Sequence, residues 1–154
     1  MLRERFSADL KDALKAKDAP RLSTLRLIVA AVKDRDIAAR GEEGAEGPDG
    51  VSDAEILAIL ARMIKQRQDS AKLYREGGRP ELAEQELGEI KVIKEYLPRQ
   101  MTEDEMRAAV GKAIAATGAA SIRDMGRVMA ELKARHAGKM DFARASAAVK
   151  EAFT

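Results

Sequence analysis

Apolar residues recur along this chain at steps of three and four, the spacing that places side chains on one face of an α-helix. The clearest example lies between residues 51 and 98. There, Ser52 with Glu55 predicts a capping box, and therefore a helix that starts near Asp53. The stripe that follows contains one charged member and consists of Leu57, Leu60, Ile64, Arg67, Ala71 and Tyr74.

A second stripe follows after a short break. Gly77 and Gly78 end the first helix, because glycine adopts a left-handed terminal conformation without a clash, and Pro80 suits the first turn of the next one. That next helix ends before Pro98. Its apolar stripe consists of Ala83, Leu87, Ile90, Ile93 and Leu97. Two such stripes joined by a tight turn predict an antiparallel helical hairpin.

The arginine on the first stripe predicts a contact across this hairpin. Arg67 precedes Gly78 by eleven residues, and an equal step beyond Gly78 reaches Glu89, with Glu86 one turn nearer. A charge that is buried without a partner costs several kcal/mol. The sequence therefore predicts a structural ion pair between Arg67 and either Glu89 or Glu86.

The remainder of the chain also has the pattern of helices. Two amphipathic stretches precede residue 40, and the residues from 40 to 50 (RGEEGAEGPDG) predict a mobile acidic loop, because they are rich in glycine and acids. After Pro98, capping residues at Thr102, Ser121 and Asp141 open three short helices. We predict an all-α, multihelical fold with a front bundle over residues 1–98, which includes the long hairpin, and a three-helix tail over residues 99–154.

Composition excludes several kinds of chemistry. The chain of 154 residues has no cysteine, so thiol catalysis and disulfides are excluded, and its single histidine, His136, has no partner for a metal site. No nucleophile with a base, phosphate loop or carboxylate pair is recognisable, so we assign no catalytic residue and expect no cofactor. The longest apolar run, Leu27 to Val32, is too short to span a bilayer, and the N-terminal residues lack a signal-peptide pattern; a cytoplasmic protein is expected.

Charge differs between the two halves of the chain. Residues 1–98 carry 18 basic and 19 acidic side chains, while residues 99–154 carry 10 and 7, so the front is −1 and the tail is +3. The candidate RNA-binding residues of the tail are Arg123, Arg127, Lys133, Arg135, Lys139, Arg144 and Lys150. These cations fit either a phosphate-binding face or an ordinary solvated surface.

Four motifs of the chain resemble the GatB/YqeY family. They are RLSTLRLIVAAVKDRDI (residues 21–37), IKQRQDSAKLYREGGRPELAEQELGEI (64–90), EYLPRQM (95–101) and the tail pair IRDMGRVMAEL with GKMDFARAS. One departure is Phe142, where many relatives have glycine. The resemblance implies a stand-alone protein whose tail is related to the C-terminal module of the GatB subunit of the aspartyl/glutamyl-tRNA amidotransferase, a module associated with tRNA recognition.

Two classes of function follow from this resemblance. The first is a non-catalytic accessory protein that binds tRNA, or subunits of the tRNA amidotransferase, through its tail. The alternative is an amidotransferase-like protein with carbon–nitrogen ligase activity that uses glutamine as the amide donor. Neither class implies a membrane or DNA partner.

Overall fold

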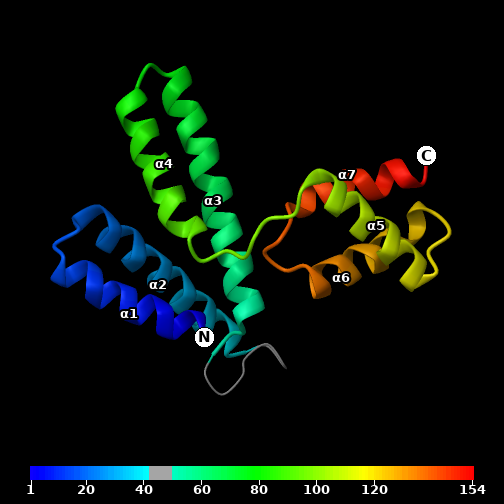
Figure 1. Ribbon diagram of the computed structural model, residues 1–154, viewed down its shortest axis with the longest axis horizontal. Coiled ribbons are helices and arrows are strands. Elements are labelled where there is room, and N and C mark those ends of the chain that lie inside the picture. Colours follow the sequence, from blue (N-terminus) through cyan, green and yellow to red (C-terminus); the bar gives the residue numbers. More distant parts are fainter. Residues whose placement is uncertain (42–49) are drawn as a thin grey trace. The chain divides into compact units, whose positions relative to one another are not determined.

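The computed structural model describes residues 1–41 and 50–154, and within them the chain is all-α, as predicted (Figure 1). The predicted mobile loop falls mainly on residues 42–49, outside the described residues. The chain divides into two compact units, Met1–Leu97 and Pro98–Thr154, each with its own hydrophobic core.

The first unit consists of four helices: α1 (Leu2–Lys15), α2 (Ala19–Ala39), α3 (Asp53–Glu76) and α4 (Pro80–Lys94). Helices α3 and α4 run side by side in opposite directions, and α1 and α2 form a second antiparallel pair (Figure 1). The turn of the α3–α4 hairpin has Gly78 in a left-handed conformation with φ +73°. The largest fully buried side chains of the core come from α2, α3 and α4: Leu25, Ile28, Ile56, Leu60 and Ile93.

The hairpin contains the ion pair expected for Arg67. The Nε atom of Arg67 lies 2.8 Å from Oε2 of Glu89, and its Nη1 donates to the carbonyl oxygen of Met63 at 3.2 Å. The buried face of α3 is wider than the predicted stripe, because Ile56, Ile59 and Met63 are buried as well. A helix packed against two neighbours buries more than one line of side chains.

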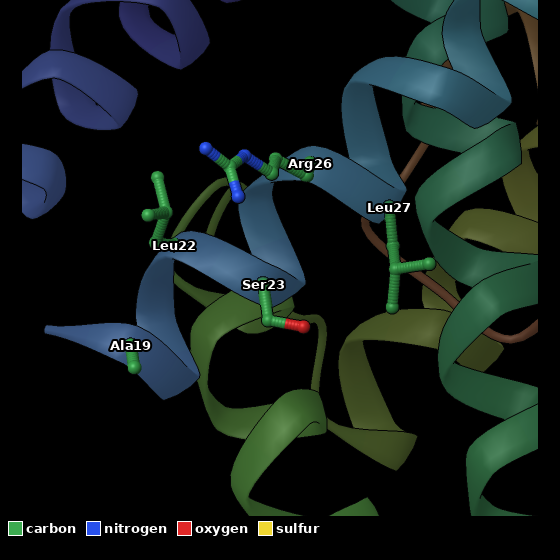
Figure 2. A pocket seen from close by; sticks show the side chains of 5 residues that line it. All are labelled: Ala19, Leu22, Ser23, Arg26 and Leu27. Atoms are coloured by element: carbon green, nitrogen blue, oxygen red, sulfur yellow. The ribbon is translucent and has the colours of Figure 1, made fainter.

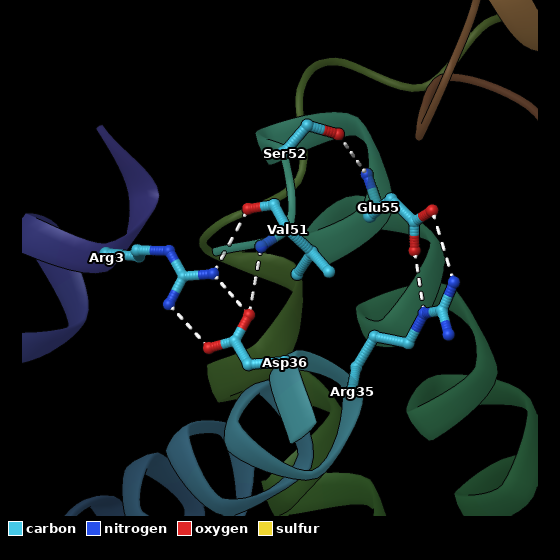
Figure 3. Close-up of polar contacts among 6 residues, drawn as sticks. All are labelled: Arg3, Arg35, Asp36, Val51, Ser52 and Glu55. Carbon is cyan, nitrogen blue, oxygen red and sulfur yellow. Dashed lines mark hydrogen bonds and ion pairs between the residues drawn. The ribbon is translucent and has the colours of Figure 1, made fainter. Parts of the chain in front are cut away.

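A polar network ties the start of α3 to α1 and α2 (Figure 3). The Arg3 guanidinium makes two bonds to the Asp36 carboxylate, at 2.7 and 2.9 Å, and also donates to the carbonyl of Val51 at 3.1 Å. The Val51 amide in turn donates to Asp36 at 2.9 Å. The Arg3 guanidinium beside Asp36 holds the pKa of this carboxyl below its usual value. One side-chain pair thus holds both backbone polar groups of Val51.

The helix start at Asp53 is correct, but the predicted capping box at Ser52 is only half formed. The Ser52 hydroxyl accepts from the Glu55 amide at 3.2 Å. The Glu55 carboxylate is instead bound to Arg35 of α2, with Nε to Oε2 at 2.9 Å (Figure 3). With arginine both partners of the bond are charged, whereas the cap amide is a neutral donor.

The segment just after α4 is anchored to α1 through Tyr96. The Tyr96 hydroxyl donates to Asp9 at 2.5 Å, and the ring meets Phe6 edge-on with 4.8 Å between centroids. The Arg5 guanidinium lies over the same ring, 4.8 Å from its centre. Burial, with a smaller contribution from Asp9, raises the pKa of the Tyr96 hydroxyl, so this group stays a hydrogen-bond donor.

The second unit consists of α5 (Glu103–Thr117), the short 3-10 helix η1 (Ile122–Asp124), α6 (Met125–Arg135) and α7 (Phe142–Ala152). The predicted caps are confirmed: Thr102 with Glu105 and Ser121 with Asp124 form complete capping boxes, and Asp141 caps α7. All three α-helices pack on one another around a core of small and medium side chains that includes Val110, Val128, Leu132, Ala145 and Val149.

Candidate nucleic-acid interface

All seven tail cations proposed from the sequence are exposed. Arg123 lies in η1, and Arg127, Lys133 and Arg135 lie on α6. Lys139 lies in the turn between α6 and α7, and Arg144 and Lys150 lie on α7. Their exposure leaves them accessible to a large ligand, but a common unit does not by itself make them one site.

Two of the seven are already engaged by acids. The Arg127 guanidinium lies 2.8 Å from Asp124, and it also donates to the carbonyl of Thr117 at 3.2 Å. Arg135 forms an ion pair with Glu131 one turn earlier on α6. Arg127 and Arg135 therefore each already have an anionic partner within the tail.

Arginines engage most of the acids of the tail. Arg99 makes two bonds to Glu105, at 2.7 and 3.1 Å, and Arg107 contacts Glu103 at 3.2 Å and Glu151 at 3.4 Å. Arg99, followed by the Thr102 backbone, lowers the pKa of Glu105 to about 2, so this carboxylate stays charged.

A group of exposed cations has no ion-pair partner in the part of the chain that the structure describes. They are Arg123, Lys133, Lys139, Arg144, Lys150 and one residue that the sequence reasoning missed, Lys112 on α5. Only Asp104 and Asp141 among the tail acids lie outside the arginine pairs, and Asp141 caps α7. The positive charge of the tail is therefore carried mainly by lysines.

These unpaired cations do not line up as one stripe. Arg144 and Lys150 are six residues apart on α7, which separates them by about 120° around the helix axis. Arg144 and Lys150 therefore lie on different sides of α7.

The tail also contains a hollow of about 430 Å³ between the start of α5 and α7. Its apolar lining includes Met101, Met106 and Met140, while Arg107 and Arg144 lie at the hollow with three acids: Glu103, Asp141 and Glu151. This mixture of charges gives the hollow no clear preference for an anion. Of the seven candidates, only Arg144 lines it.

No group of three or more histidine or acidic side chains in residues 1–41 and 50–154 is arranged to hold a metal ion. Among those same residues, no helix is both long enough and apolar enough to cross a membrane.

Comparison with known proteins identifies the family. A family model described as YqeY-like protein matches residues 3–153 of this chain. The chain belongs to the YqeY-like protein family. This result confirms the resemblance carried by the sequence motifs.

Curated relatives of this YqeY-like chain occur in yeasts, where each is called altered inheritance of mitochondria protein 41, mitochondrial. The protein of Lachancea thermotolerans is 33% identical over 58% of this chain and 44% of its own length. The protein of Clavispora lusitaniae is 34% identical, over 60% and 49% of the two chains, and that of Saccharomyces cerevisiae is 29% identical, over 66% and 51%. The chain thus matches about half the length of these relatives. The cytoplasmic location expected from the sequence stays a prediction.

Proposed function

We propose that this YqeY-like protein is a non-catalytic accessory protein that binds tRNA through its tail. The observation that carries the proposal is the set of exposed tail cations that have no ion-pair partner among the described residues, Arg123, Lys133, Lys139, Arg144 and Lys150. An exposed cation without a partner is free to release a counterion from a phosphate, and this release drives most non-specific nucleic-acid binding.

The distribution of these cations supports folded RNA over a single strand. Folded RNA is recognised largely through its shape and its phosphates, for which dispersed exposed cations suffice. Single strands need aromatic side chains on which the bases stack. The two aromatic residues of the tail, Phe142 and Phe153, pack against its core.

The test is a tRNA-binding titration by fluorescence anisotropy at low salt. The tail variant Lys133→Glu/Lys139→Glu/Lys150→Glu should bind at least about tenfold more weakly than the wild type, because three counterion-releasing contacts are lost. The matched control is Lys11→Glu/Lys72→Glu/Lys91→Glu, which makes the same change in net charge at exposed lysines of the first unit. Both variants should keep the helical circular dichroism of the wild type.

Each other outcome has a definite meaning. Equal loss in the two variants assigns binding to net charge and removes the tail as the site. Wild-type protein that does not bind tRNA at low salt overturns the RNA proposal. Co-purification with amidotransferase subunits in that case favours a protein partner, and the carbon–nitrogen ligase alternative then requires glutamine-dependent activity of the assembled complex.

A further inference from the structure

Helix α2 has apolar residues on both of its sides. Leu25, Ile28 and Val32 face the core and are almost fully buried. On the opposite side, Leu27 is 44% exposed and Ile37 58% exposed. The solvent side of α2 thus carries two exposed large apolar side chains among polar and charged ones.

The order of residues on this solvent side is self-complementary. It contains Ser23, Arg26, Ala30, Asp34 and Ile37, all of them exposed. Suppose that two copies of α2 run in opposite directions and cross at Ala30. A residue n positions before Ala30 in one copy then lies opposite the residue n positions after Ala30 in the other copy. Arg26 then faces Asp34, and Ser23 faces Ile37. A two-fold axis repeats each pair, as an isologous dimer requires.

We propose that this face of α2 binds a second copy of the chain in an antiparallel helix pair centred on Ala30. Charge complementarity is the first argument. Neither Arg26 nor Asp34 has an ion-pair partner in the part of the chain that the structure describes. The proposed pairing gives each a partner of opposite sign, twice per dimer. A parallel pair would place Arg26 against Arg26 and Asp34 against Asp34.

Shape is the second argument. A hollow of about 330 Å³ lies along the first half of α2 and is lined by Ala19, Leu22, Ser23, Arg26 and Leu27. Figure 2 shows these side chains, with Ser23 between Ala19 and Leu27. The antiparallel pairing places Ile37 of the second copy opposite Ser23, so an exposed apolar side chain enters an open apolar hollow. The small Ala30 at the crossing point allows the two helices to approach closely.

The dimer should be weak. One helix face per copy is smaller than the roughly 800 Å² per partner of a standard stable interface. A dissociation constant on the order of 10–100 μM is therefore expected. In sedimentation equilibrium the weight-average mass should rise from 16.8 kDa toward twice that value over this concentration range.

Charge exchange tests the pairing. The single variants R26E and D34R should each weaken the dimer at least about tenfold, because each puts like charges opposite each other. The double variant R26E/D34R restores both pairs with reversed sign and should recover dimerisation. The control R62E changes an exposed arginine of α3 and should dimerise as the wild type does. All three side chains involved are exposed, and helical circular dichroism verifies that each variant is folded.

Cross-linking provides an independent readout, since the chain has no cysteine of its own. Under mild oxidation, Ala30→Cys should yield a covalent dimer, while Ala58→Cys at an exposed position of α3 should not. Wild-type protein that stays monomeric at several hundred micromolar overturns the proposal. Dimers that R26E and D34R do not weaken overturn it too, because another interface then holds them together. A monomeric Ala30→Cys chain whose thiol is protected from labelling also overturns it, because the chain itself then covers this face.

Discussion

Arg67 of α3 and Glu89 of α4 form an ion pair in the hairpin, with 2.8 Å between Nε and Oε2. Only 14% of the Arg67 side chain and 19% of the Glu89 side chain are exposed. Both groups have therefore lost most of their hydration, and each depends on the other for compensation. This mutual dependence distinguishes the Arg67–Glu89 pair from the Lys65–Asp69 pair on α3, whose side chains are both exposed.

We expect Glu89→Ala to lower the free energy of unfolding by about 2 kcal/mol, because it leaves a largely buried guanidinium without its carboxylate. This value is below the 3–5 kcal/mol of a fully buried pair, since the residual exposure gives some screening. Urea denaturation measures the effect. Asp69→Ala in the exposed pair is the control and should change stability by less than about 0.5 kcal/mol. Similar losses in the two variants would contradict the role assigned to Glu89.

Gly50 provides a second prediction about the network at the start of α3. Its φ is +93°, and a Cβ atom added there would lie 2.5 Å from Nη2 of Arg3 and 2.6 Å from Oδ1 of Asp36. Gly50→Ala should therefore both strain the backbone and displace the Arg3–Asp36 pair, lowering stability by about 2–3 kcal/mol.

Gly88→Ala is the matched control for Gly50→Ala. Gly88 lies inside α4, and nothing is within 4 Å of an added Cβ. Alanine at a helical position stabilises by about 0.5–1 kcal/mol relative to glycine. The two substitutions should thus change the melting temperature in opposite directions. A neutral Gly50→Ala would show that the Arg3–Asp36 contact can move without loss.

Local sequence spacing predicted the parts of the fold that depend on neighbours in the chain. The caps at Thr102, Ser121 and Asp141 join groups within three residues of each other, so their motifs determine them. The Arg67–Glu89 pair could be predicted from the sequence, because residues equally far from a tight turn lie opposite each other in a hairpin. No such spacing rule predicts the contacts of Arg3 with Asp36 and Val51, which are 33 and 48 residues away in the chain.

The tail cations illustrate the same division. The sequence analysis chose them by their charge and their place in the tail, and did not consider which of them pair with acids. Arg127 and Arg135 are three and four residues from Asp124 and Glu131, a spacing known to favour ion pairs, so the sequence contained this information. Lys112 lies on α5, outside the last two helices, where the candidate cations cluster in the sequence.

Acid titration should reveal how much the ionised Asp36 carboxylate contributes to stability. Arg3 holds the folded-state pKa of this group below the value of about 3.9 expected in the unfolded chain. Its ionised form therefore contributes stability above about pH 4, and that contribution is lost as the pH falls through the folded-state pKa. We expect the stability difference between wild type and Asp36→Asn, measured by urea unfolding, to be constant from pH 7 to pH 5 and to shrink below pH 4. A constant difference down to pH 2.5 would refute this assignment.

The salt dependence of tRNA binding tests how many tail cations contact phosphates. The logarithm of the binding constant should fall linearly with the logarithm of salt concentration, with a slope of about −0.7 to −0.9 for each phosphate neutralised. Replacing Lys133, Lys139 and Lys150 with glutamine removes three unpaired cations and should make the slope shallower by about 2. Arg127→Gln with Arg135→Gln removes two cations that acids already neutralise, so its slope should remain close to that of the wild type. If the arginine variant changes the slope as much as the lysine variant, the ion pairs open on binding and the distinction between paired and unpaired cations fails.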